Sequence, residues 1–189
     1  EGLSSINYGT FQYCNSLTTV NFPKSLQNIG NWAFYNTKLQ KIDLSGLTDL
    51  RLIGENAFSN CEELTEVLFP ISLEQLGNRV FSNCRKLMAI DLSKTQLTAV
   101  SEGIFESCEM LESFKLPKTV ETIDGYAFAW NNKLAGILEL GPKFKSMGEN
   151  AFSGTQISIV KCEATTPPTL KSNSMPEVWE TAFVPEGYA

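Results

Sequence analysis

The chain has 189 residues, of which 42% are hydrophobic, and this is enough to bury a core in one domain. Its formal net charge of −6 disfavours nucleic-acid and anionic-membrane partners, since both would need a basic face. The sequence contains no histidine, which removes most catalytic triads and histidine-ligated metal sites. No apolar run approaches the ~18 residues of a membrane span, so we expect no membrane insertion. Because histidine is absent, we also expect no bound metal, and we expect no cofactor.

A phenylalanine recurs along the chain at alternating intervals of 23 and 24 residues. The seven members of this column are Phe11, Phe34, Phe58, Phe81, Phe105, Phe128 and Phe152. An aliphatic residue stands five positions before each of them, at Ile6, Ile29, Ile53, Leu76, Val100, Ile123 and Met147. A repeat of this length predicts a solenoid, in which each coil buries its apolar face only by stacking on its neighbours.

Each repeat closes with the pattern L-x-x-[VIF]-x-[LF], as in LTEVLF and LMAIDL. This alternation predicts a short strand that pairs in parallel with the strands of adjacent coils. The other half of the repeat, I-G-x-x-A-F-x-x-C, predicts a second short extended piece that ends in a tight turn or a 3₁₀ turn.

Four of the five cysteines stand three residues after a phenylalanine of this column, and the fifth, Cys162, falls in the last strand. The four are Cys14, Cys61, Cys84 and Cys108. Because side chains in one column of a solenoid run parallel, their Cβ vectors do not point toward one another, as a disulfide requires. No C-x-x-C pair of a zinc site is present. We therefore expect free thiols that pack as small hydrophobic groups.

From Leu3 to about Cys162, the pattern I-G-x-x-A-F-x-x-C-x-x-L-x-x-V-x-[LF]-P resembles the BspA-like leucine-rich repeats. The resemblance implies an α/β repeat solenoid, right-handed and curved, made mainly of short parallel strands with turns or 3₁₀ segments. Residues 1–164 would form seven repeats of 23 or 24 residues, and residues 165–189 a capping segment of the same domain. Since the pattern is already running at Glu1, we expect a longer parent protein.

The outward-pointing residues in the middle of the strands vary in kind, whereas the inward positions do not. Such variation is typical of a recognition surface on a fixed scaffold, and also of ordinary solvent exposure. The first candidate binding site is this column of residues: Asn21, Asp43, Leu68, Asp91, Lys115, Glu139 and Lys161.

Aromatic residues at variable positions near the phenylalanine turns form the second candidate site. They are Tyr13, Trp32, Tyr35, Tyr126 and Trp130. The alternative is that these rings only pack over the neighbouring turn.

The resemblance implies a secreted or cell-surface bacterial protein of the adhesion type. We expect a monomeric, non-catalytic module that binds an extracellular protein or glycan. The alternatives are a glycan-processing β-solenoid enzyme and a structural spacer in a larger surface protein. Asp43 and Asp91 would lie two coils apart, about 10 Å, which is near the spacing of an inverting glycosidase. Leu68 separates them, however, and we expect no catalytic residue.

Overall fold

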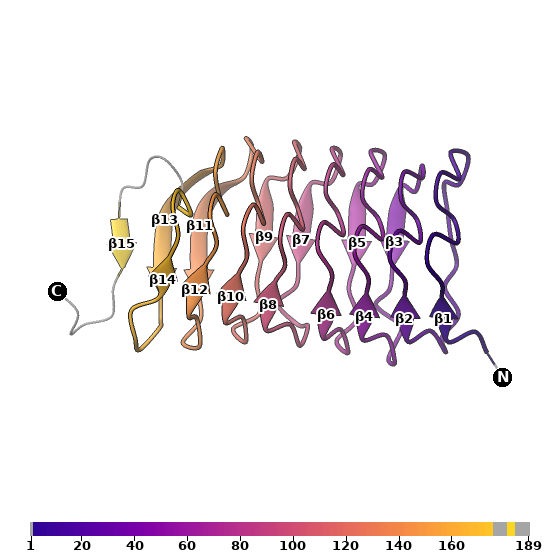
Figure 1. Ribbon diagram of the computed structural model, residues 1–189, viewed down its shortest axis with the longest axis horizontal. Coiled ribbons are helices and arrows are strands. Elements are labelled where there is room, and N and C mark those ends of the chain that lie inside the picture. The colour runs from indigo at the N-terminus through magenta and orange to yellow at the C-terminus, as the bar shows by residue number, and fades with distance from the viewer. Residues whose placement is uncertain (1, 176–180, 184–189) are drawn as a thin grey trace.

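The computed structural model describes residues 2–175 and 181–183, which form a β-solenoid with its coils side by side along the long axis (Figure 1). The L-x-x-[VIF]-x-[LF] segments and the last coil give one set of strands, β3 (Lys41–Asp43), β5 (Glu66–Leu68), β7 (Ala89–Asp91), β9 (Ser113–Lys115), β11 (Ala135–Leu140) and β13 (Gln156–Cys162). A further strand, β15 (Thr181–Phe183), pairs with β13 outside this sequence pattern. The aliphatic column gives the other set, β1 (Ser5–Ile6), β2 (Asn28–Ile29), β4 (Leu52–Ile53), β6 (Gln75–Leu76), β8 (Ala99–Val100), β10 (Thr122–Ile123), β12 (Ser146–Met147) and β14 (Thr169–Leu170).

The two sets of strands lie on opposite faces of the molecule (Figure 1). We call the face with β3, β5, β7, β9, β11 and β13 the strand face, and the opposite one the return face. Every strand pair of the described residues is parallel, for example β3 with β5 and β7 with β9. On the return face the aliphatic residues are register partners, such as Ile29 with Ile53. This arrangement confirms the predicted stack of short parallel strands.

The recurring phenylalanines form a continuous stack between the two faces. Consecutive ring centroids from Phe11 to Phe152 are 4.9–5.7 Å apart. The planes of Phe58 and Phe81 differ by only 4°, and every ring except that of Phe11 is fully buried. Each ring therefore packs against the ring of the next coil, and this contact fixes the register between the two coils.

Each coil also contains two residues in the left-handed backbone region, two positions before and two after the phenylalanine, with φ between 53° and 73°. They are Gly9 and Tyr13, Trp32 and Asn36, Asn56 and Asn60, Arg79 and Asn83, Gly103 and Ser107, Tyr126 and Trp130, and Asn150 and Gly154. In the first six coils, the N–H groups of these two residues and of the phenylalanine between them donate to carbonyls of the next coil. The bond from Phe58 N to Val80 O, at 3.0 Å, is one example.

This geometry corrects the predicted fold class, because residues 2–175 and 181–183 contain no α-helix and no 3₁₀ helix. The α/β description is therefore wrong, and the solenoid is built of strands and turns. The physical reason is the pair of left-handed residues, since a right-handed helical turn cannot continue through them. Each returning segment consequently alternates turn bonds within the coil, such as Ser59 N to Asn56 O, with bonds to the next coil, such as Phe58 N to Val80 O. The right-handed coil sense and the curvature stay predictions.

The cysteine column has a role beyond apolar packing. The thiols of Cys61, Cys84 and Cys108 are buried, and each donates to the carbonyl oxygen of the phenylalanine one coil earlier, over 3.2–3.3 Å. In the next coil the same position is Asn131, whose Nδ2 donates to Phe105 O at 2.9 Å. The column thus supplies a hydrogen-bond donor between coils, and all five cysteines are free thiols, as predicted.

The solenoid register continues into the segment predicted to be a cap. Leu170 is the register partner of Met147, and Asn173 has a φ of 51°, as expected two positions before a phenylalanine. Met175 then occupies the phenylalanine position and packs against the core. Residues 169–175 therefore begin a further coil with a degenerate sequence. Residues 176–180 and 184–189 of the predicted cap lie outside the described residues.

Candidate binding surface

The structure places all seven residues of the first candidate column at exposed positions on the strand face. Six of them pair in register between adjacent strands: Asp43 with Leu68, Asp91 with Lys115, and Glu139 with Lys161. Asn21 occupies the equivalent position in the first coil, where no strand is assigned. The column is continuous because the central aliphatic residue of each strand points inward and its neighbours therefore point outward.

Opposite charges meet between coils along this column. Lys115 Nζ lies 3.8 Å from Asp91 Oδ2, and Lys161 Nζ lies 3.9 Å from Glu139 Oε1. These side chains are more than half exposed, so each pair contributes little to folding. They leave the strand face with charges of both signs that are close to balance.

A second outward column runs beside the first and was missed in the sequence analysis. It consists of Lys41, Glu66, Ala89, Ser113, Ile137 and Ile159, which lie two residues before members of the first column. Lys41 Nζ and Glu66 Oε2 form an ion pair of 3.0 Å, whereas Ile137 is the register partner of Ile159. The period of two in a strand was the signal that could have identified these residues.

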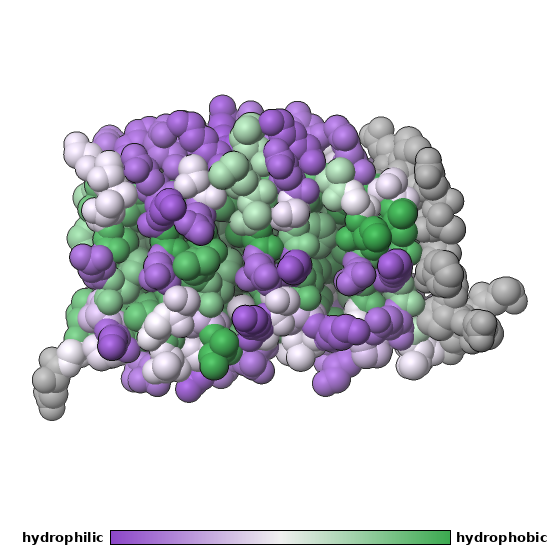
Figure 2. Space-filling model, turned by 180° about the vertical axis from the view of Figure 1, so that it is seen from behind, coloured by the Kyte–Doolittle hydropathy of each residue, from purple (hydrophilic) through white to green (hydrophobic). Residues whose placement is uncertain are grey.

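Apolar side chains lie exposed among these charges. Leu68 is 43% exposed and Ile137 is 42% exposed. Figure 2, which views the strand face, shows a band of hydrophobic residues along the molecule, interrupted by hydrophilic groups and bordered by them. Apolar groups with a polar border are the general arrangement of a protein–protein interface.

A shallow cavity of about 390 Å³ opens on the strand face over β9, β11 and β13. Its lining includes Phe114 and Ile137, together with the charged residues Lys115, Glu139 and Lys161. At its border Lys118 Nζ lies 3.1 Å from Glu163 Oε1. The cavity therefore combines an apolar wall with charged groups that can orient a ligand.

The two aspartates considered as a glycosidase pair are turn caps. Asp43 Oδ1 accepts hydrogen bonds from the backbone N–H of Ser45 at 3.0 Å and from its hydroxyl at 2.6 Å. Asp91 accepts the same two bonds from Ser93. The hydroxyl bonds from Ser45 and Ser93 are the main reason that the pKa of each carboxyl is lowered. A general acid needs a raised pKa, so this geometry disfavours that role.

The aromatic candidates divide into two groups on the return face. Tyr35 contacts both Tyr13 and Trp32, with ring centroids 5.4 and 4.6 Å apart. Tyr126 and Trp130 form a separate pair at 5.9 Å, four coils further along. Trp32 and Tyr35 are half-buried, whereas Tyr13 and Trp130 are exposed, so packing over the neighbouring turn describes only some of these rings.

Within residues 2–175 and 181–183, no group of three or more carboxylate or thiol side chains is arranged to hold a metal ion. The same residues contain no helix of the length and apolarity needed to cross a membrane.

A family model described as the BspA type leucine rich repeat region matches residues 1–110 and 51–173, with six copies. Among solved structures, the chain is similar to a leucine-rich repeat protein from Bacteroides ovatus, with 25% identity and a TM-score of 0.78 over 89% of this chain and 43% of that one. A leucine rich cell surface protein from Faecalibacterium prausnitzii gives 28% identity and a TM-score of 0.75, over 88% and 44%.

A leucine-rich repeat protein from T. pallidum has the same fold, with 22% identity and a TM-score of 0.56 over 93% of this chain and 64% of that one. The chain spans less than half the length of the B. ovatus and F. prausnitzii proteins. No curated protein gives a significant match.

Proposed function

The chain belongs to the BspA-type leucine-rich repeat family, and we propose that it is a non-catalytic adhesion module that binds an extracellular protein through its strand face. One structural relative is a leucine rich cell surface protein, which supports placement of this chain at a bacterial surface. The observation that carries the proposal is the exposure of Leu68 and Ile137 among charged side chains on the parallel strands of one face.

The charge pattern favours a protein over a uniformly charged polymer. The two outward columns contain three lysines and four acidic residues, so their net charge is 3 − 4 = −1. A polyanion or a polycation would prefer a surface of one sign, whereas a protein surface can complement both signs.

The cavity over β9, β11 and β13 offers a place for an anchoring side chain of the partner. Phe114 and Ile137 provide apolar contact there, and Lys115, Glu139 and Lys161 provide polar groups beside it. Binding energy in protein interfaces is concentrated where one side chain enters such a desolvated position. We therefore expect this end of the strand face to contribute most of the affinity.

The enzyme alternative has less support. The lowered pKa values of Asp43 and Asp91 suit turn caps that stay ionised, and exposed Leu68 lies beside Asp43 in register. The other carboxylates of the two outward columns, Glu66 and Glu139, each form an ion pair with a lysine, which is not the apolar environment that a general acid requires.

The test is direct binding to a panel of purified extracellular-matrix proteins, measured by biolayer interferometry. The variant Leu68→Ser/Ile137→Ser removes the exposed apolar groups but leaves every ion pair and turn cap in place. Because both residues are more than 40% exposed, the double variant should keep the melting temperature of the wild type. We expect it to weaken binding by at least about tenfold, mainly through faster dissociation.

The matched control is Glu112→Ser/Lys133→Ser, which changes two exposed residues outside the two columns and should bind like the wild type. Unchanged affinity of the Leu68→Ser/Ile137→Ser variant would show that the strand face is not the binding surface. Absence of binding to the whole panel would favour the structural-spacer alternative.

A further inference from the structure

The left-handed positions of the return face are occupied by two kinds of residue. Eight of the fourteen are asparagine or glycine, the residues that adopt this conformation most readily. The others include Tyr13, Trp32, Tyr126 and Trp130, with φ of 58–61°. A bulky side chain is unfavourable at such a position, and backbone conformations of this kind concentrate at functional sites. These aromatic residues therefore require an explanation beyond folding.

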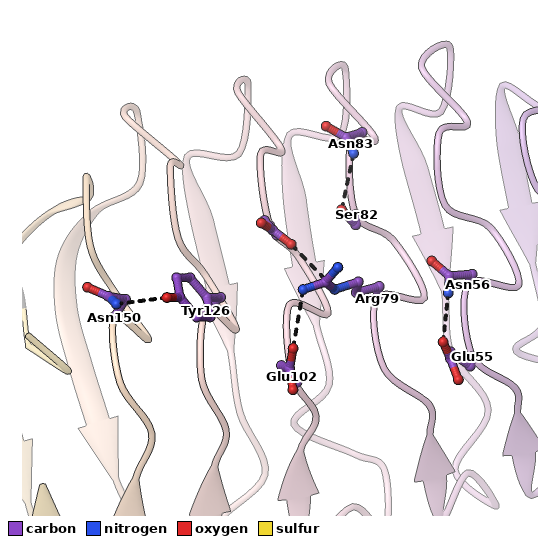
Figure 3. A network of polar contacts seen from close by, with 9 residues as sticks. Glu55, Asn56, Arg79, Ser82, Asn83, Glu102, Tyr126 and Asn150 are labelled. Carbon is purple, nitrogen blue, oxygen red and sulfur yellow. Dashed lines mark hydrogen bonds and ion pairs between the residues drawn. The ribbon is translucent and has the colours of Figure 1, made fainter. Parts of the chain in front are cut away.

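Contacts within the chain explain two of the bulky left-handed residues (Figure 3). Arg79 lies 3.2 Å from Glu102 and 3.7 Å from Glu106, both in the next coil. The hydroxyl of Tyr126 accepts a hydrogen bond of 3.2 Å from Nδ2 of Asn150. Among residues 2–175, no hydrogen bond joins the side chains of Tyr13, Trp32 or Trp130 to another group.

Tyr13 and Trp32 differ from Trp130 because they belong to a larger cluster. Tyr35 lies between them and contacts both rings, and we call Tyr13, Trp32 and Tyr35 the aromatic platform. Tyr13 is 57% exposed, and within residues 2–175 the hydroxyl of Tyr35 also has no hydrogen-bond partner. The platform thus presents ring faces together with two free hydroxyls and a free indole N–H.

The sequence that carries the platform is poor in charge, although exposed Glu55 of the next coil lies beside it and its carbonyl oxygen accepts a hydrogen bond from Trp32 N at 2.9 Å. Between Gly2 and Thr37 the sequence has a single charged residue, Lys24, although 19% of the whole chain is charged. Amide side chains are frequent there instead, including Gln12, Asn31 and Asn36. An amide both donates and accepts hydrogen bonds, as a sugar hydroxyl does. A charged ligand would find few counter-charges in this part of the chain, whereas a neutral polyhydroxylated ligand would find hydrogen-bonding partners among the amides.

We propose that the aromatic platform is a binding site for neutral carbohydrate. The C–H faces of pyranose rings would pack on Tyr13 and Trp32, and the ring hydroxyls would bond the polar tips of the platform and the amides beside it. Aromatic side chains suit this role because they provide rigid apolar area with a polar group at one edge. The site lies on the return face and is independent of the proposed protein-binding strand face.

The experiment uses the full chain and immobilised neutral hexasaccharides of glucose, mannose, galactose and N-acetylglucosamine. A sialylated and a sulfated glycan serve as charged probes. The variants are Tyr13→Asn and Trp32→Asn, because asparagine is the commonest left-handed residue in this solenoid and the backbone should accept it. The matched control is Trp130→Asn, which removes an exposed left-handed tryptophan outside the platform.

We expect at least one neutral glycan to bind at millimolar concentration or below, and each platform variant to weaken binding by at least about tenfold with an unchanged melting temperature. Trp130→Asn and the strand-face variant Leu68→Ser/Ile137→Ser should bind the same glycan like the wild type. The proposal is overturned if no neutral glycan binds, if only the charged probes bind, or if folded Tyr13→Asn and Trp32→Asn retain wild-type affinity. None of these outcomes bears on the strand face, because its test uses protein ligands.

Discussion

The thiol of Cys84 donates a hydrogen bond of 3.2 Å to the carbonyl oxygen of Phe58, one coil earlier in the solenoid. The same relation joins Cys61 to Phe34 and Cys108 to Phe81. These thiols are buried, and in two cases the thiol gives the carbonyl oxygen a second donor, because Phe58 O and Phe81 O also accept the backbone N–H of Cys61 and Cys84. The cysteine column therefore connects neighbouring coils through hydrogen bonds as well as through packing.

This burial predicts a loss of stability at alkaline pH. Burial raises the pKa of Cys108 from 9.0 to about 12, and it also raises the pKa of Cys61 and Cys84. Because the pKa of Cys108 in the folded state lies above its unfolded value, the stability that the neutral thiol contributes is complete below pH 9. This stability is lost as the pH rises toward 12. We expect the free energy of unfolding to fall by on the order of 1 kcal/mol per pH unit for each such thiol.

Chemical denaturation between pH 8 and 11 measures this dependence, with Cys108→Thr as the comparison. Threonine occupies the same column at Thr37 and Thr155, and the hydroxyl of Thr155 donates a hydrogen bond to Phe152 O without titrating. The variant should show a shallower alkaline slope than the wild type. Identical slopes would mean that Cys108 is not buried as a neutral thiol.

The close approach of coils at the Ile-Gly position gives a second prediction. A Cβ added at Gly77 would lie 2.5 Å from Glu55 N and 2.8 Å from Gly54 C, whereas one added at Gly46 would meet nothing within 4 Å. Gly77→Ala should therefore destabilise the protein by about 1–3 kcal/mol, as overpacking against backbone usually does. Gly46→Ala should be neutral or slightly stabilising, because it restricts only the unfolded chain. Thermal melts of the two variants decide this, and equal effects would contradict the stacking of the coils.

The phenylalanine stack gives a third prediction. Phe81 is fully buried between Phe58 and Phe105, at centroid distances of 5.6 and 5.7 Å. Phe11 is half-buried and stacks on one column neighbour, Phe34, at 5.0 Å. We expect Phe81→Ala to cost about 3–5 kcal/mol and Phe11→Ala about 1–2 kcal/mol in urea denaturation. Equal costs at the two positions would be inconsistent with a stack that runs the length of the molecule.

The turn cap at Asp91 gives a prediction for acid conditions. Its pKa is lowered from the ordinary value of 3.8, chiefly by the hydroxyl of Ser93. A lowered folded pKa contributes stability above pH 3.8 that disappears as the pH falls through the folded value. Asp91→Ala should therefore cost about 0.5–1.5 kcal/mol at pH 7, and the difference from the wild type should vanish in strong acid. Ser93→Ala should reproduce this pattern, and a pH-independent difference would argue against the cap.

Much of the fold could be predicted from the sequence because the recurring residues show which positions of neighbouring coils are equivalent. The phenylalanine and aliphatic columns identified the coils, and the alternation in segments such as LTEVLF identified the strands and one outward column. The left-handed positions were harder to predict. Asn56, Asn60 and Asn83 are typical of that conformation, but Trp32 and Arg79 at equivalent positions are not, so propensity gave conflicting signals.

The cysteine column was predicted as apolar packing because thiols are weak donors. The residues that replace cysteine in this column, Thr37, Asn131 and Thr155, can all donate a hydrogen bond, and they were the available signal for its real role. The candidate sites were harder to predict than the fold. Neighbouring coils bring Tyr13 beside Tyr35 across 22 residues of sequence, and no local pattern indicates which aromatic residues will meet in this way.

Binding of an extracellular protein through the strand face can be tested by one measurement. Hydrogen–deuterium exchange of the chain, alone and with whichever protein of the extracellular-matrix panel binds it, tests this most directly. We expect slower exchange in peptides that contain β5, β7, β9 and β11, with no change in the segments around Trp32 and Tyr126 on the return face. Protection confined to the return face, or no binding by any protein of the panel, would contradict this expectation.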